Sequence, residues 1–74
     1  MIKKIKVKPI HETLTSTGTM WEYILMQKGW NELPDRDKYG YITNMYEGGL
    51  VDVYFPGLDF TCGNIFTDEI CLFK

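Results

Sequence analysis

Residues 39–55 read Tyr-Gly-Tyr-Ile-Thr-Asn-Met-Tyr-Glu-Gly-Gly-Leu-Val-Asp-Val-Tyr-Phe, and this stretch decides the fold class. Two runs rich in aromatic and β-branched residues flank a Gly-Gly pair, which is the pattern of a β-hairpin whose turn residues take positive φ. A two-residue turn at 48–49 sets the register, and Tyr46 then opposes Val51. The sequence therefore predicts an antiparallel hairpin.

The two strands of this hairpin, residues 39–47 and 50–55, each have two faces of different polarity. One face is apolar, and we expect it to face the core. Its apolar residues are Ile42, Val51, Val53 and Phe55. The other face is mixed, and in this register Met45 opposes Asp52. Its residues are Tyr41, Thr43, Met45, Asp52 and Tyr54.

Upstream of the hairpin, the chain predicts one strand and two polar loops. Residues 2–8 alternate weakly between lysine and apolar residues, which indicates a strand with one solvated face that Pro9 ends or places at an edge. Residues 11–19 are polar and predict a loop. Residues 29–38 contain Gly, Pro-Asp and several charges, and they predict a second, long loop.

Residues 20–28 allow two interpretations. Thr19 and Glu22 have capping-box spacing, and Gly29 stands where a helix would end, which favours a helix. The polar residues of the segment do not gather on one helical face, however, and its aromatic residues favour a strand. We expect a strand, with a short helix at 20–28 as the alternative.

Downstream of the hairpin, the sequence predicts short elements. Pro56 and Gly57 form a turn, and residues 58–61 form a short strand that Gly63 closes. Residues 64–69 combine turn-forming residues with two apolar ones, as a 3₁₀ turn does. Residues 70–73 form the last strand.

This order of elements resembles the small SH3-like barrels, including the KOW and Tudor groups, over roughly residues 20–73. The resemblance implies a mainly β fold, a five-stranded barrel within a single domain spanning 1–74. Residues 1–19 would then add an N-terminal strand and loop. The Ala-Leu-Tyr-Asp-Tyr motif of peptide-binding SH3 domains is absent, and no glycine occupies a clear KOW position. The resemblance therefore implies a fold and no particular ligand.

Charge is distributed unevenly along the 74 residues, whose net charge is −2. The basic N-terminal segment carries Lys3, Lys4, Lys6 and Lys8 and no acid. The other 66 residues set four basic side chains against ten acidic ones, a formal charge of −6. An acidic body disfavours nucleic-acid binding and favours a protein partner with a basic surface. The alternative is that the charge serves solubility alone.

Cysteine content and hydropathy indicate a cytoplasmic protein without a membrane segment. The longest uncharged apolar run is 23–26, far shorter than a membrane span, and no signal-peptide core follows the lysines. Two cysteines, Cys62 and Cys71, are fewer than a disulfide-dependent small domain carries, although a bridge between neighbouring strands stays open. With His11 they are too few for a structural zinc site, and we expect no cofactor.

The sequence shows no recognisable set of catalytic residues. Ser16 and His11 share one polar loop without an oxyanion glycine pair, and nothing local supports a pair of Cys62 with His11. The run that starts at Asp35 imitates a calcium loop, but Tyr39 stands at the fifth position and Tyr46 at the twelfth, where ligands belong. We expect no enzymatic activity.

What remains for function is an aromatic and acidic surface. Tyrosine and tryptophan are enriched at interface hot spots, and carboxylates steer basic partners. The candidate partner-binding residues are Trp30, Asp35, Asp37, Tyr39, Tyr41, Asp52 and Tyr54. In the alternative, Tyr41 and Tyr54 cover a second small core against 2–8 or 20–26.

These observations favour a small interaction protein that binds and modulates or inhibits one macromolecule, in the style of a virus- or mobile-element-encoded inhibitor. A second hypothesis is a nucleic-acid-binding barrel, with the N-terminal lysines on phosphate and Tyr41 or Tyr54 stacking on bases. A third is a subunit that forms a homo-oligomer by pairing its basic strand with its acidic body.

Overall fold

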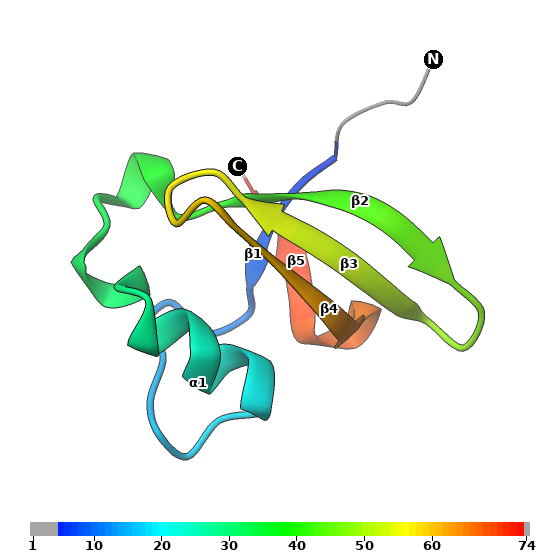
Figure 1. Ribbon diagram of the computed structural model, residues 1–74, viewed down its shortest axis with the longest axis horizontal. Coiled ribbons are helices and arrows are strands. Elements are labelled where there is room, and N and C mark those ends of the chain that lie inside the picture. The colour runs from blue at the N-terminus through cyan, green and yellow to red at the C-terminus, as the bar shows by residue number, and fades with distance from the viewer. Residues whose placement is uncertain (1–4, 74) are drawn as a thin grey trace.

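The computed structural model describes residues 5–73, which form one antiparallel sheet, one α-helix and short 3₁₀ turns (Figure 1). The elements in chain order are β1 (Lys6–Pro9), α1 (Met20–Gln27), η1 (Trp30–Glu32), η2 (Asp35–Asp37), β2 (Gly40–Tyr46), β3 (Leu50–Phe55), β4 (Phe60–Phe66), η3 (Thr67–Glu69) and β5 (Ile70–Leu72). The β2–β3 hairpin extends to one end of the molecule, and η1 and η2 lie at the other (Figure 1).

The five strands pair in the order β4-β3-β2-β1-β5, which confirms the mainly β fold. No strand pairing joins β4 to β5 within residues 5–73, so the sheet is open. β1 lies inside the sheet between β2 and β5, and its last residue, Pro9, opposes Ile70. Cys62 on β4 and Cys71 on β5 therefore belong to the two outermost strands rather than to neighbouring ones, and both thiols are free.

Residues 20–27 form helix α1, so the strand expected for this segment is wrong. The Glu22 carboxylate accepts a hydrogen bond from the Thr19 N–H at 3.2 Å, and Gly29 has a left-handed φ of 101° just after the helix. Trp21 and Leu25 are buried one turn apart. Glu22 is buried as well, and therefore the polar residues do not gather on one face of the helix.

The hairpin forms, but with a different register from the one expected. Tyr46 opposes Leu50 rather than Val51, because Glu47 joins Gly48 and Gly49 in a three-residue turn. Both glycines have the expected positive φ. A bulge at Thr43 then shifts the pairing by one residue.

The apolar face of β3 packs into the core as expected. Val53 is 0% exposed, and Phe55 meets the Trp30 ring edge-on with centroids 5.6 Å apart. The buried hydrophobic residues of the core are Val7, Leu14, Trp21, Leu25, Trp30, Val51, Val53, Phe55, Cys62 and Ile65. Ile42 is half-buried and packs against this core.

Strand β4 is longer than expected and runs through Gly63. A bulge opposite Asp52 and a positive φ of 59° at Asn64 let it continue where the sequence predicts an end. The 3₁₀ turn is confined to 67–69 inside the predicted 64–69, and β5 confirms the last strand. None of the helices in residues 5–73 combines the length and apolar character needed to span a membrane.

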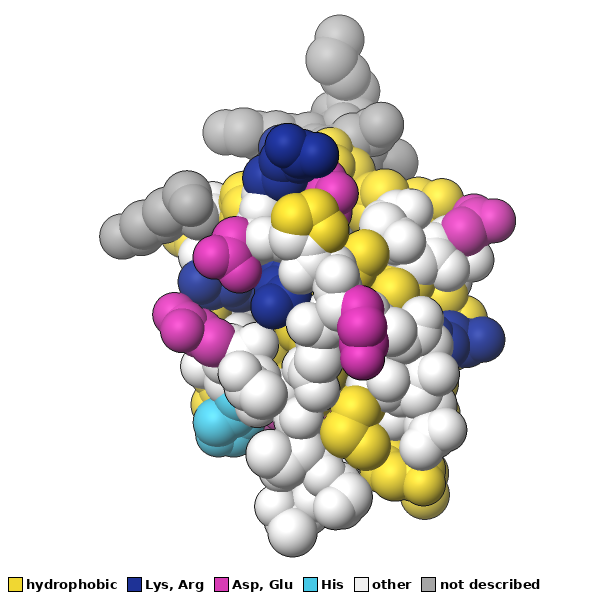
Figure 2. Space-filling model, turned by 90° about the vertical axis from the view of Figure 1, so that its left-hand side faces the viewer, with side chains coloured by type: hydrophobic (Ala, Val, Ile, Leu, Met, Phe, Trp, Pro, Cys, Tyr) yellow, Lys and Arg dark blue, Asp and Glu magenta, His cyan; other side chains and the backbone are white. Residues whose placement is uncertain are grey.

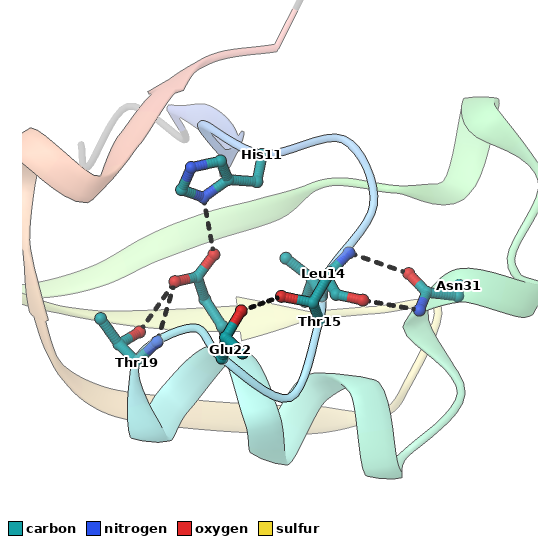
Figure 3. A network of polar contacts seen from close by, with 7 residues as sticks. His11, Leu14, Thr15, Thr19, Glu22 and Asn31 are labelled. Atoms are coloured by element: carbon teal, nitrogen blue, oxygen red, sulfur yellow. Dashed lines mark hydrogen bonds and ion pairs between the residues drawn. The ribbon is translucent and has the colours of Figure 1, made fainter.

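The polar loop between β1 and α1 is held by two contacts with the folded body (Figure 3). His11 Nδ1 lies 3.1 Å from the Glu22 carboxylate at the start of α1. Asn31 in η1 bonds the backbone of Leu14 in both directions, accepting from its N–H at 3.1 Å and donating to its C=O at 3.0 Å. Leu14 itself is buried, so an apolar anchor and polar bonds together fix the loop.

Candidate protein-binding face

The strand register lines up side chains on the outer face of the sheet. Lys6 on β1 opposes Tyr41 on β2, Tyr41 opposes Tyr54 on β3, and Tyr54 opposes Thr61 on β4. Because Val53 and Phe55 point into the core, Tyr54 between them must point outward. The register thus places Tyr41 and Tyr54 side by side on the face away from the core, as the sequence predicts.

Two more rings extend this row beyond the strands. The Tyr39 ring lies 5.5 Å from the Tyr41 ring, edge-on at 81°, and 5.3 Å from the Phe73 ring. The Lys6 ammonium sits 4.6 Å from the centre of the Tyr39 ring, within cation–π range. We call Tyr39, Tyr41, Tyr54 and Phe73 the tyrosine face, and all four side chains are half-buried.

Carboxylates flank the tyrosine face and bind tyrosine hydroxyls. Tyr54 donates to Asp59 at 2.9 Å, and Tyr46 donates to Asp52 at 2.7 Å. Each hydrogen bond raises the pKa of its tyrosine, so these hydroxyls remain protonated donors at neutral pH. A hydrogen bond with Tyr41 likewise raises the pKa of Tyr39.

Asp52 occupies an unusual position between two bulges. The bulge at Thr43 in β2 and the bulge in β4 both lie beside it, so neither neighbouring strand pairs regularly there. Asn44 donates to the Asp52 carboxylate at 3.2 Å. It lies opposite Asp52, at the position that the expected register gave to Met45. A Cβ on Gly63 would lie 2.9 Å from Asp52 Oδ1, so the missing side chain makes room for this carboxylate.

The two loop carboxylates differ in their surroundings. Asp37 precedes β2, and its charge adds to the Tyr41 hydrogen bond in raising the pKa of Tyr39, so it acts on the tyrosine face. Asp35 is fully exposed, and its carboxylate lies 3.7 Å from the Lys38 ammonium. The structure therefore groups Asp37 with the tyrosines and Asp35 with Lys38.

The structure corrects the placement of Trp30. Its side chain is 1% exposed and packs against Phe55, so it offers no contact area to a macromolecular partner. The polar loop around it indicated a surface position. The chain turns sharply at Gly29, however, and η1 brings the indole ring under the sheet.

The sequence reasoning missed three members of this region. Asp59 lies just beyond the hairpin in the turn after Phe55, Phe73 lies far along the chain from it, and the expected register assigned Tyr46 to the core face. For Asp59 the available signal was its place after Pro56-Gly57, a turn that brings it back beside Tyr54. For Phe73 no local pattern indicated contact with Tyr39.

Comparison with protein-family models, curated proteins and solved structures finds no match to this chain. We therefore infer its function from the arrangement of its own residues. Within residues 5–73 no three side chains among His, Cys, Asp and Glu come together as metal ligands would.

Proposed function

We propose that this protein is a non-enzymatic binding protein whose tyrosine face engages one protein partner with a basic surface. The observation that carries the proposal is the placement of Tyr39, Tyr41 and Tyr54 on the outer face, ringed by carboxylates. Tyrosines supply large contact area, and here ring contacts and hydroxyl bonds already restrict them, so binding costs less side-chain entropy. The carboxylates Asp37, Asp52 and Asp59 would attract the basic partner.

By covering a basic functional surface of its partner, this protein would modulate or inhibit the partner without catalysing a reaction itself. A small acidic chain that acts in this way fits a virus- or mobile-element-encoded inhibitor working in the cytoplasm of its host. The free thiols of Cys62 and Cys71 support a reducing compartment.

We further propose an SH3-like arrangement in which β1 supplies the first strand in place of residues 20–28. Support comes from the position of β1 between β2 and β5 and from the one-turn η3 between β4 and β5. Curling of the open sheet would bring β4 towards β5, and α1 would then lie within the long connection from β1 to β2.

Nucleic-acid binding remains a second candidate because Lys6 lies beside the tyrosines. Its ammonium neighbours Tyr41 in the register and sits over the Tyr39 ring. The Tyr39 ring is thus already in contact with a cation, and the carboxylates Asp52 and Asp59, on the same side of the sheet, would repel phosphate. The protein partner is therefore the better fit.

The proposal is tested by parallel affinity capture from a lysate of the source cells. Wild type, the double variant Tyr41→Ala/Tyr54→Ala and the control Tyr23→Ala serve as baits, followed by quantitative mass spectrometry. Tyr23 is 40% exposed on α1, outside the tyrosine face. One protein enriched by wild type and Tyr23→Ala but lost with a folded double variant is the expected result. A partner retained equally by all three baits would place the interface elsewhere.

A further inference from the structure

A cavity of about 390 Å³ opens between the end of β1, the start of the polar loop and the η1–η2 segment. Its lining combines apolar, cationic and anionic side chains: Lys8, Pro9, His11, Glu12, Thr13, Trp30, Asp35, Arg36, Lys38 and Phe73. On the side of the molecule formed by η1 and η2, lysine and arginine side chains lie among carboxylates, with the histidine nearby (Figure 2). A cavity of this volume suits a small organic group.

The cations at this cavity lack close carboxylate partners. The Lys38 ammonium is 3.7 Å from Asp35, and the Arg36 guanidinium is 4.0 Å from Asp37, both longer than a charged hydrogen bond of about 2.7–2.9 Å. Lys8 has no ion pair among residues 5–73. The Lys38 side chain is also only 20% exposed, so water screens its charge less than that of a surface lysine.

The charge balance selects the valence of the missing partner. Lys8, Arg36 and Lys38 line the cavity beside the carboxylates of Glu12 and Asp35. Arg36 also has Asp37 at 4.0 Å and Lys38 has Asp35 at 3.7 Å, so Lys8 is the lining cation without an ion pair among residues 5–73. A monoanion matches this one unpaired cation, whereas a phosphate dianion would bring a second negative charge among the carboxylates.

The apolar part of the lining selects the body of the ligand. Pro9 and Trp30 are buried residues that contribute to the cavity wall, and Phe73 adds a half-buried ring. Trp30 is 1% exposed and forms the floor of the cavity, so the Phe73 ring supplies the apolar contact area. The contact with Tyr39 already holds that ring, so an apolar group binds it at little entropic cost.

We propose that this cavity binds a carboxylate carried on a small apolar group. Lys8, Arg36 and Lys38 would donate to the carboxylate, while the Phe73 ring contacts the apolar body close to the buried Trp30 indole. The same chemistry is offered by a free aromatic acid and by the C-terminal carboxylate of a peptide that ends in an apolar residue.

The test is an NMR titration of ¹⁵N-labelled protein with phenylacetate, read at the two indole N–H signals. Trp30 lines this cavity, whereas Trp21 lines a separate groove between α1 and β4 and serves as the internal reference. We expect a saturable shift of the Trp30 signal with a Kd of about 1 mM or tighter, and an unchanged Trp21 signal. Neutral phenylacetamide should bind at least tenfold more weakly. Equal binding of the amide, or no shift of the Trp30 signal up to 20-fold above that Kd, overturns the proposal.

Variants locate the site. Lys38→Met keeps the aliphatic stem and removes the charge, and it should weaken phenylacetate binding at least tenfold. Lys28→Met is the matched control, because its ammonium lies over the Phe60 ring at the other groove. If Lys38→Met fails to fold, Arg36→Gln replaces it, since the Arg36 side chain is 85% exposed. Undiminished binding by the folded variant contradicts the assignment.

Two further ligands, a peptide and inorganic phosphate, distinguish a peptide terminus from a free acid and a carboxylate site from a phosphate site. A tripeptide ending in phenylalanine with a free carboxylate is compared with its C-terminal amide. Tighter binding of the acid peptide than of phenylacetate assigns the site to a peptide terminus, and the reverse order assigns it to a free acid. Inorganic phosphate that shifts the Trp30 signal at lower concentration than phenylacetate would overturn the carboxylate assignment.

Discussion

Glu22 is the charged side chain on which the connection between the polar loop and α1 depends. It is only 5% exposed, and burial of a carboxylate is costly unless hydrogen bonds compensate. Its carboxylate receives the Thr19 N–H, the Thr19 hydroxyl at 3.0 Å and a contact from His11. Burial raises the pKa of Glu22, but the Thr19 N–H, His11 and the Thr19 hydroxyl outweigh it, so the pKa lies below its ordinary value of 4.5.

We expect Glu22→Gln to make the free energy of unfolding less dependent on pH in the acidic range. A carboxyl whose pKa is lowered in the folded state stabilises the protein above its unfolded pKa, and this contribution disappears as pH falls through the folded value. The wild type should lose stability as pH drops below about 4.5, and Glu22→Gln should lose less while being less stable at pH 7 by about 1–3 kcal/mol.

Thermal melts followed by circular dichroism from pH 7 to pH 3 measure this difference. Glu12→Gln is the control, because Glu12 is an exposed carboxylate in the same loop. Parallel pH curves for wild type and Glu22→Gln would show that the buried carboxylate is not linked to folding.

Trp30 shows why single side chains in loops are hard to place from sequence. Its neighbours are Gly29, Asn31 and Glu32, and a polar setting indicates exposure. Burial depends instead on where η1 docks, and that position follows from Asn31 binding Leu14 and from Phe55 on a distant strand. No local pattern carries this information.

For the strands, alternation predicted the inner face of β3 but not the pairing of β2. Val51, Val53 and Phe55 are buried as expected, because a strand without a bulge keeps its period of two. β2 contains the bulge at Thr43, and a bulge moves the following residues to the other face. For this reason Tyr46 lies beside Asp52 on the outer face, although the pattern assigned it to the core side.

The helix was predicted only as the alternative because its periodicity is obscured. Thr19 and Glu22 signalled the start of α1, and Gly29 signalled its end. Because Glu22 is buried with the apolar residues and Tyr23 is exposed, polar and apolar residues do not separate onto two faces of the helix. An aromatic residue such as Tyr23 also favours a strand. Capping signals were more informative here than periodicity.

Gly40 at the start of β2 allows the sheet to pack closely. A Cβ at this position would lie 2.5 Å from Val53 Cγ1 and 2.9 Å from Phe55 Cδ1. We expect Gly40→Ala to destabilise the protein by about 1–3 kcal/mol, because both neighbours are fully buried and the backbone must shift. Urea unfolding curves measure this cost.

The matched control for this substitution is Met45→Ala, at a position of the same strand that is 68% exposed and lies outside the bulge. It should change stability by about 0.5 kcal/mol or less. If Gly40→Ala unfolds at the same urea concentration as wild type, Val53 and Phe55 do not pack against β2 as the structure has them.

Across the molecule, local sequence patterns predicted the fold class and the exposed face of the hairpin, but not the contacts between separate segments. The mainly β class, the hairpin and the outward position of Tyr41 and Tyr54 follow from local patterns. The contact of Tyr39 with Phe73 joins segments distant in sequence, so composition and periodicity do not report it. The contact of Tyr54 with Asp59 is local and depends on the geometry of the turn between them.

The acidic body leads us to expect no binding to mixed-sequence duplex DNA tighter than about 10 μM at physiological salt. Asp52 and Asp59 lie on the face that carries Lys6, and they would repel phosphate there. Fluorescence anisotropy with labelled duplex and single-stranded DNA measures this. Sub-micromolar binding that weakens steeply with salt would instead favour the nucleic-acid function.

The most direct test of the tyrosine face is surface plasmon resonance of the purified partner against Tyr54→Ala, with Tyr23→Ala as control. We expect Tyr54→Ala to raise the dissociation rate and cost about 2 kcal/mol, roughly a 30-fold weaker Kd, without altering the fold. Tyr23→Ala should bind like wild type. A folded Tyr54→Ala protein with wild-type affinity and dissociation rate would contradict the assignment of this face as the binding surface.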